Sequence, residues 1–274
     1  MTFSYKDQFD LTGKVAVVTG ACGTLGPGMC EGLAEQGAHV VLSDIKAKAA
    51  TELAAALTDR FGVQCIGVEC DVADEASVEA MTREAVSAFG HVDILLNNAA
   101  NATPDLEAYF APFEAYSLDE WRRNLTVDLD GMFLVAKHVG AEIAKTGRGG
   151  SIIQTASIYA AYGSDNRIYE GAEYKGTAIN NPAVYSSGKA GVLGLTRWLA
   201  THWAKDGVRV NALVPGGVQS GQNEEFVRRY ANRVPMARMG RKEEVVGPML
   251  WLASDASSYV TGQFIFVDGG LSAW

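Results

Sequence analysis

Positive charge and long apolar runs are both scarce in this chain of 274 residues. Lysine and arginine number 23 against 32 aspartates and glutamates, and the formal net charge is −9. A surface with this excess of acid repels phosphate backbones and anionic lipids, so we expect no nucleic-acid or membrane partner. No apolar run approaches the roughly 20 residues that a membrane-spanning helix needs. Residues 1–7 also lack the pattern of a secretion signal.

Cysteine is scarce as well, and the few thiols are not arranged as metal ligands. The chain has four cysteines and four histidines, with no Cys-x-x-Cys pair and no zinc-finger spacing. We therefore expect no metal site, and reduced thiols in a cytoplasmic protein. A Gly-x-Ser-x-Gly turn, which would favour a serine hydrolase, is missing too, although a triad can assemble from residues distant in sequence.

A regular alternation of strand and helix patterns fills the chain instead. Short β-branched apolar runs are typical of buried parallel strands, and apolar residues at helical spacing separate them. Composition shows no linker-like change and no repeat, which predicts a single α/β domain over residues 1–274. It would be a doubly wound Rossmann-type fold, a seven-stranded parallel sheet with helices on both faces. The predicted strands are 15–19, 39–44, 63–70, 92–96, 151–155, 208–214 and 263–267, and the predicted helices start near 29 and span 47–61, 78–90, 117–145, 185–205 and 242–253.

Glycines cluster directly after the first predicted strand, at positions 20, 23, 26 and 28. Glycine lets a backbone approach a pyrophosphate, and the helix that follows offers free N–H groups and a positive dipole end. The stretch favours a dinucleotide site; the alternative is a tight turn without a ligand. The residues expected at the phosphates are Gly20, Gly23, Thr24, Leu25 and Gly26.

The second predicted strand ends in an acid, Asp44, which lies 44 − 20 = 24 residues after Gly20. A carboxylate here accepts the adenosine ribose hydroxyls and repels a 2′-phosphate, which favours NAD over NADP. Lys46 is the nearby cation, and no arginine follows. A loop or capping role for Asp44 is the alternative.

Tyr185 and Lys189 are four residues apart on a predicted helix, and therefore on one face of it. An ammonium near a phenol favours the phenolate and lowers the pKa of the tyrosine. A phenol tuned in this way can take a proton from an alcohol or return one to a ketone. The spacing alone is common, so its meaning depends on the rest of the chain.

Together these patterns resemble the short-chain dehydrogenase/reductase family over almost the whole chain. The motifs that carry the resemblance are Thr19-Gly20 with the glycine turn, Asp71-Val72, Asn97-Asn98-Ala99, Ser157, Tyr185 with Lys189, Asn211, Pro215-Gly216, Tyr259-Val260-Thr261-Gly262 and Val267-Asp268-Gly269-Gly270.

The resemblance implies a role for each matching residue. Tyr185 would be the general acid/base, Lys189 would lower its pKa and bind the nicotinamide ribose, and Ser157 would orient the substrate oxygen. Asp71 would meet the adenine edge. The other cofactor contacts implied are Val72, Asn98, Ala99, Pro215, Gly216, Val218 and Ser220.

Two departures from the family pattern are single residues. Thr24 takes the place of a glycine in the turn, and Asp128 stands where the family has a catalytic asparagine. An ionised aspartate accepts a hydrogen bond from a relay water but cannot donate one. Its charge would also shift the pKa values of Lys189 and Tyr185 upward. Asn124, one helical turn away, is a candidate for partial compensation.

The third departure is the length between Ser157 and Tyr185, 185 − 157 = 28 residues, about twice the family's usual gap. Similar insertions occur in members that resemble sugar or sugar-acid oxidoreductases. We expect segments 158–183 and 219–240 to cover the substrate, the alternative for the insertion being a surface loop or subunit contact. Their polarity and arginines fit a hydroxylated, anionic substrate, with solvated arginines as the alternative. The candidate substrate contacts are Ser157, Tyr159, Arg167, Tyr185 and Arg228.

We therefore expect an NAD-dependent dehydrogenase that oxidises a secondary hydroxyl of a sugar, polyol or sugar acid. Two alternatives stay open. One is a carbonyl reductase of a keto sugar or of an acyl or alicyclic ketone, and the other is a protein that senses NAD without turnover. The resemblance also implies a homotetramer or homodimer.

Overall fold

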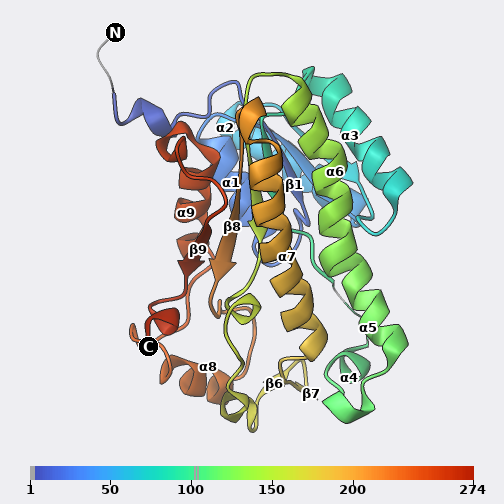
Figure 1. Cartoon of the computed structure of the whole chain (residues 1–274), viewed down its shortest axis with the longest axis vertical. Coiled ribbons are helices and arrows are strands. Elements are labelled where there is room, and N and C mark those ends of the chain that lie inside the picture. Colours follow the sequence, from blue (N-terminus) through green and yellow to red (C-terminus); the bar gives the residue numbers. More distant parts are fainter. Residues whose placement is uncertain (1–3, 102, 104) are drawn as a thin grey trace.

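A single parallel sheet forms the centre of the computed structural model, which describes residues 4–101, 103 and 105–274. Its seven strands lie in the order β3-β2-β1-β4-β5-β8-β9, with every neighbouring pair parallel (Figure 1). The strands are β1 (Val15–Thr19), β2 (His39–Asp44), β3 (Cys65–Glu69), β4 (Ile94–Asn97), β5 (Gly150–Thr155), β8 (Val208–Pro215) and β9 (Phe264–Val267).

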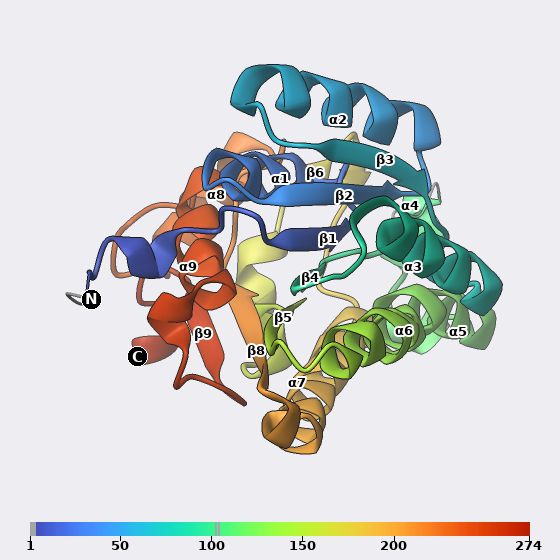
Figure 2. The same ribbon diagram turned by 90° about the horizontal axis from the view of Figure 1, so that it is seen from above.

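Helices cover both faces of the sheet, as the sequence predicts (Figure 2). One layer contains α1 (Gly26–Glu35), α2 (Ala47–Phe61) and α9 (Glu243–Ala253), and the other contains α3 (Glu75–Phe89), α6 (Gly131–Lys145) and α7 (Ala183–His202). Ala16 and Val18 of β1 pack into the first layer and Val17 into the second. Burial on both sides explains why the central strands are continuous apolar runs rather than alternating ones.

The predicted single helix over 117–145 is interrupted by a wider turn. Ser117 caps α5 (Leu118–Leu125) by accepting a hydrogen bond from the Glu120 N–H, as the capping pattern indicates. A π-helical turn, η3 (Thr126–Asp130), then joins α5 to α6, and the flanking residues keep right-handed helical dihedrals. This turn contains the buried Asp128, and such turns are frequent at functional sites.

The segments between the main strands and helices contain secondary structure of their own. Segment 158–183 holds two 3₁₀ helices and a short hairpin, and segment 219–240 holds α8 (Glu224–Ala231). Segment 101–116 includes α4 (Leu106–Tyr109), while its residues 102 and 104, like residues 1–3 of the N-terminal stretch, lie outside the described part. The remaining elements are β6 (Glu173–Tyr174), β7 (Thr177–Ala178), η1 (Asp7–Phe9), η2 (Phe113–Ala115), η4 (Ile158–Ala160), η5 (Asn166–Tyr169), η6 (Ala204–Asp206), η7 (Asp255–Ser257) and η8 (Leu271–Ala273).

Segments 158–183 and 219–240 pack against each other at one end of the molecule. Their shared apolar cluster is separate from the two cores beside the sheet, and Figure 1 shows α8 and the β6–β7 hairpin together below the strand ends. The buried residues of this cluster are Ile168, Ala172, Phe226, Tyr230, Val234 and Met239. The two segments therefore form one unit that sits where parallel strands open their ligand crevice.

None of the helices in the described residues combines the length and the apolar character needed to cross a bilayer.

Candidate active site

The turn after β1 is shaped so that a ligand can approach its backbone. Gly20 has φ +64°, and a Cβ there would lie 2.8 Å from the Cα of Ala99. A Cβ on Gly26, at the start of α1, would lie 2.3 Å from the carbonyl oxygen of Gly20. Only glycine fits both places, and the resulting tight turn leaves the N-terminus of α1 accessible.

Hydrogen bonds tie this turn to the end of β4. The Thr19 Oγ1 accepts from the N–H groups of Asn98 (3.0 Å) and Ala99 (3.1 Å). The Asn98 side-chain amide donates to the Thr19 carbonyl oxygen at 3.1 Å. The amide and small residues after β4 thus lie directly against the glycine turn.

Asp44 is held in place at the end of β2. Its Oδ2 accepts from the Cys22 N–H at 2.8 Å and its Oδ1 from the Lys46 N–H at 3.0 Å. The carboxylate is 8% exposed and lines the same cavity as the glycine turn. Both the ribose-binding role and the structural role considered for this acid are therefore compatible with its geometry, since each oxygen keeps a second lone pair.

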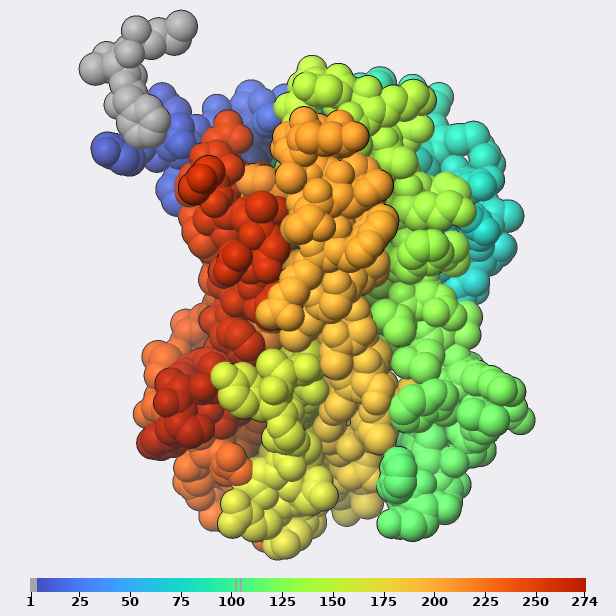
Figure 3. Space-filling model, viewed as in Figure 1, coloured from blue at the N-terminus to red at the C-terminus, as the bar shows by residue number. Residues whose placement is uncertain are grey.

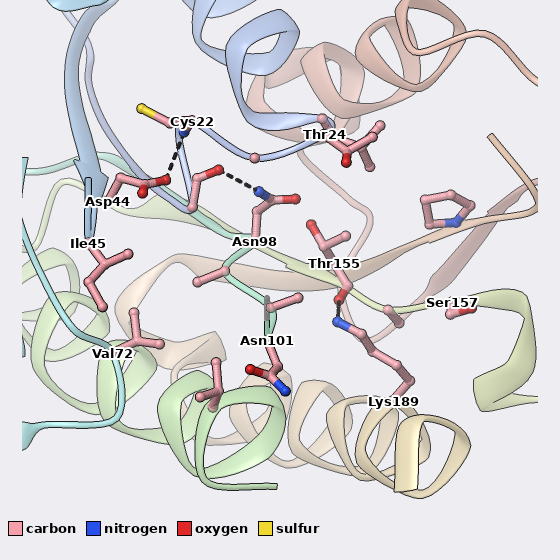
Figure 4. A pocket seen from close by; sticks show the side chains of 18 of the residues that line it. Cys22, Thr24, Asp44, Ile45, Val72, Asn98, Asn101, Thr155, Ser157 and Lys189 are labelled. Carbon is pink, nitrogen blue, oxygen red and sulfur yellow. Dashed lines mark hydrogen bonds between the residues drawn. The ribbon is translucent and has the colours of Figure 1, made fainter. Parts of the chain in front are cut away.

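A cavity of about 540 Å³ runs from Asp44 past the glycine turn to the ends of β5 and β8 (Figure 4). It brings together most of the predicted cofactor and catalytic residues: Gly20, Gly23, Thr24, Leu25, Asp44, Asp71, Val72, Asn98, Ala99, Ser157, Tyr185, Lys189, Pro215, Gly216, Val218 and Ser220. Gly26 lies behind the lining, where it allows the turn to close.

Several lining residues were missed by the sequence reasoning. Each lies within two residues of a predicted residue at a strand end or turn, so this position was the available signal. These residues are Cys22, Ile45, Lys46, Cys70, Ala100, Asn101, Val127, Thr155 and Ala156.

The catalytic candidates gather at the far end of this cavity. Tyr185 and Lys189 lie on α7, and Ser157 follows β5. The Lys189 Nζ is buried and donates to the Thr155 carbonyl oxygen at 3.1 Å. A hydrogen bond links the Ser157 hydroxyl and the Tyr185 phenol, and the Ser157 Oγ also accepts from the Tyr159 N–H at 3.3 Å.

At the catalytic end of the cavity, the pKa shift of Tyr185 differs from the one expected from the sequence. Burial raises the pKa of Tyr185, the hydrogen bond with Ser157 lowers it, and the charge of Asp128 raises it further. Burial lowers the pKa of Lys189, while Asp128 raises it. The expected net lowering of the tyrosine pKa by Lys189 is therefore wrong for this geometry, because burial of the phenol is the larger effect.

Asp128, in the π-helical turn, lies close to Tyr185 and Lys189 and also binds the loop after β4. Its Oδ1 accepts from the Asn101 N–H at 2.7 Å. Asn124 does not substitute for the family's asparagine, since its amide donates to the carbonyl and carboxylate oxygens of Glu120, both at 2.7 Å.

Three candidate substrate residues lie outside this cavity. Tyr159 lines a second, smaller cavity next to it. Arg167 and Arg228 line neither cavity; they are exposed, and each pairs with a carboxylate, Asp165 and Glu225 respectively. The structure thus corrects the choice of these two arginines, whose guanidinium groups lie at the surface outside both cavities.

Comparison with known proteins agrees with this geometry. The family model described as enoyl-(acyl carrier protein) reductase matches residues 20–272. The cis-4-hydroxycyclohexanecarboxylate dehydrogenase of Sinomonas cyclohexanicum is 38% identical over 264 residues, which cover 95% of this chain and 97% of that protein. The chain belongs to the short-chain dehydrogenase/reductase family.

Other short-chain dehydrogenases/reductases are similar at comparable levels. The 2-dehydro-3-deoxy-D-gluconate 5-dehydrogenase of Dickeya dadantii is 33% identical over 271 residues, or 96% of this chain and 97% of that one. The crystal structure of a gluconate 5-dehydrogenase from Burkholderia cenocepacia, in complex with NADP and tartrate, superposes with a TM-score of 0.85 and 32% identity, covering 98% of both chains.

Membership of the short-chain dehydrogenase/reductase family makes the chain an oxidoreductase that acts on an alcohol or ketone with a nicotinamide cofactor. The residues present fit that cofactor. The turn has no room for a Cβ at Gly20 or Gly26, and the cavity volume is in the range of sites that enclose small molecules.

Proposed function

We propose that this protein is an NAD-dependent dehydrogenase that oxidises a secondary hydroxyl of a sugar, polyol, sugar acid or related alicyclic hydroxy acid. One observation carries the proposal. Ser157, Tyr185 and Lys189 lie at one end of the cavity whose other end is formed by Asp44. A cofactor that binds along this cavity would present its reactive end to the serine and tyrosine.

The side chains support this oxidation as follows. Ser157 binds the substrate oxygen, and Tyr185 in its phenolate form takes the proton of the hydroxyl. A bound nicotinamide would supply the hydride acceptor for the same carbon, and loss of the hydride together with the hydroxyl proton would leave a C=O bond. Lys189 supplies a positive charge beside the phenolate, and the charge of Asp128 favours the protonated form of that lysine.

The substrate class rests on the similar proteins and on the polar covering segments. The relatives named above act on a hydroxycyclohexane carboxylate and on a sugar acid. Segments 158–183 and 219–240 carry tyrosines and charged side chains, several of which line the second cavity next to this site. Those groups suit a substrate with several hydroxyls or a carboxylate.

The preference for NAD rests on Asp44. Its fixed carboxylate at the end of β2 would accept a ribose hydroxyl and repel a 2′-phosphate. Lys46 also lines this end of the cavity, and two similar structures bind NADP. Comparing kcat/KM for NAD and NADP tests this point, and an NADP preference would contradict it.

A second candidate, a carbonyl reductase of a keto sugar or alicyclic ketone, is favoured by one observation. Burial raises the pKa of Tyr185, so the protonated phenol that a reductase uses as its acid is the favoured form. Faster turnover in the reducing direction at neutral pH would support this candidate over the first.

The experiment is a panel of sugars, polyols and hydroxy acids, and the corresponding ketones, assayed in both directions with each cofactor. Tyr185→Phe should lower kcat by a factor of about 10²–10⁴, because it removes the proton acceptor. Tyr259→Phe is the matched control, since Tyr259 is fully exposed. If NAD binds and no compound turns over, the protein senses the cofactor; if Tyr185→Phe keeps full activity, the assignment of Tyr185 is wrong.

The assembly proposed is a homotetramer or homodimer, in line with the family resemblance. Exposed aromatic residues on α6 and α7, Phe133 and Trp198, support a subunit contact there. All four cysteines are free thiols, which fits the reducing cytoplasm.

A further inference from the structure

A second cavity, of about 140 Å³, lies between the segment that follows Ser157, the segment that contains α8, and the C-terminal residues. Figure 3 shows the C-terminal residues beside the segment around residue 160 on one face of the molecule. Tyrosines 159, 162 and 230 and Trp274 contribute aromatic walls, and Arg233 and Asp165 contribute the charged groups. The cavity therefore offers apolar surface next to a guanidinium.

This cavity adjoins the catalytic end of the larger one. Tyr159, in its wall, is two residues from Ser157 and is close enough to Tyr185 to raise the pKa of that phenol. Tyr230 also lines this cavity, and its hydroxyl accepts from the Gly217 N–H, next to Gly216 of the larger cavity. A substrate held by Ser157 can thus extend past Tyr159 towards Arg233.

Arg233 differs from the other arginines of the covering segments in using one guanidinium nitrogen, rather than two, in its side-chain contacts among the described residues. Arg228 and Arg229 both bind Glu225, with N···O distances of 2.6–3.0 Å, and Arg238 forms a two-pronged pair with Glu244. Among the described residues, the partner of the Arg233 guanidinium is Asp165, through one nitrogen. Arg233 is also the one arginine among the described residues that line either cavity.

The net charge of the side chains around Arg233 in the second cavity suits a ligand with a single negative charge. The Asp165 carboxylate, 14% exposed, is shared by Arg167 and Arg233, so two cations and one anion leave a net charge of +1. A carboxylate brings one negative charge, whereas a phosphate monoester brings about 1.5 to 2.

We propose that Arg233, held by Asp165, binds a carboxylate of the substrate in this second cavity. The inference rests on the proposed oxidation at Ser157 and Tyr185, and it narrows the substrate class to hydroxy acids. The N–H groups of the guanidinium match a carboxylate in a planar, two-pronged contact. The tyrosines and Trp274 cover the carbon frame between the hydroxyl that reacts and the carboxylate.

Binding can be tested without turnover. Cyclohexanecarboxylate and cyclohexanecarboxamide are titrated calorimetrically into the NAD-saturated enzyme and into Arg233→Gln. The variant should bind the acid about 10–100-fold more weakly and the amide within about two-fold of the wild type, because only the acid uses the ionic contact. Arg233→Lys keeps the positive charge but loses the planar, two-pronged guanidinium. Its affinity for the acid should therefore lie between those of the wild type and Arg233→Gln.

Arg241→Gln is the matched control, since it removes the same charge from a solvent-exposed arginine that lines neither cavity. It should leave both affinities unchanged, and unchanged NAD binding reports an intact fold in every variant. Acid affinity equal to that of the wild type in Arg233→Gln, or an equal loss for acid and amide, would overturn the proposal.

The substrate panel separates this proposal from the one on which it rests. Hydroxy acids and their carboxamides are compared as substrates: a KM that rises for the acids alone in Arg233→Gln, with kcat kept, supports the carboxylate site. Oxidation of neutral alcohols with no preference for acids would overturn the site and leave the dehydrogenase function standing. Selective acid binding without any turnover would support the site and contradict the function.

Discussion

Asp128 places a buried negative charge beside Tyr185 and Lys189, where the family resemblance leads one to expect a neutral amide. Its position is set by the π-helical turn and by the hydrogen bond from the Asn101 N–H. The charge raises the pKa of both members of the pair. The charge of Asp128 thus opposes the effect of burial on the pKa of Lys189 and adds to the effect of burial on the pKa of Tyr185.

Asp128→Asn should move the pH profile of alcohol oxidation to lower pH. Oxidation needs the Tyr185 phenolate, so activity rises as pH passes the pKa of this group. Removing the negative charge of Asp128 lowers the pKa of Tyr185. It also lowers the pKa of Lys189. Since Tyr185 itself is retained, maximal kcat should stay within about ten-fold of the wild type, a smaller loss than removal of an acid/base group causes.

The measurement is kcat against pH for the wild type, Asp128→Asn and Asp130→Asn. Asp130 ends the same π-helical turn but is exposed, so its neutralisation should leave the profile in place. An unmoved profile in Asp128→Asn, or a shift to higher pH, would show that the aspartate charge does not act on the pair.

At the scale of elements, the strand β1, the glycine turn and helix α1 act as one unit. Gly26 lies where α1 begins, and the backbone of the turn folds over it within 2.3–2.6 Å of where a Cβ would stand. Gly28, two residues on, has more room, since a Cβ there would lie 3.5 Å from the Val246 Cγ2, an ordinary packing distance. Of these two glycines, Gly26 is therefore the one that a close backbone contact requires to be glycine.

Gly26→Ala should destabilise the fold and weaken NAD binding together. The added methyl meets backbone atoms, so the turn must shift, at a cost of about 1–3 kcal/mol in the free energy of unfolding. Urea unfolding and NAD titration measure both effects. Gly28→Ala is the control, and it should be neutral or stabilise by up to about 1 kcal/mol through helix propensity. NAD affinity equal to that of the wild type in Gly26→Ala would contradict the role of the turn.

At the scale of the whole molecule, helices α6 and α7 leave aromatic side chains on the surface. Trp198 is 60% exposed and stacks on His202, and Phe133 is 50% exposed. Figure 1 shows the two helices side by side on the same face of the sheet. Paired apolar surface of this kind suits a self-complementary contact between two copies of the chain.

Light scattering after size exclusion should therefore give a mass of two or four times 29.2 kDa. Trp198→Glu should at least halve that mass, because it buries an unpaired charge in the contact. Phe9→Glu, an equivalent change at an exposed residue of η1, should have no effect. A wild-type monomer, or an unchanged mass in Trp198→Glu, would rule out this contact.

The path of the chain and most of the cofactor cavity could be predicted because they depend on local patterns. β-branched runs buried on both faces mark the strands, and glycines without room for a Cβ mark the turn. Asp44 was found from its spacing to Gly20 at the end of the second predicted strand, and Ser157 from the resemblance to the family. The residues missed there, such as Ile45 and Thr155, are neighbours that carry no chemical signal of their own.

What only the tertiary structure decided depends on contacts between distant segments. Burial, invisible in the spacing of Tyr185 and Lys189, reverses the expected pKa shift of the tyrosine. Likewise the sequence marks a group of arginines, but only folding shows that Arg228 is paired with Glu225 while Arg233 lines a cavity. Local pattern determines the fold and the cofactor turn because backbone geometry is local, whereas side-chain ionisation and ligand contacts depend on which charges the fold brings together.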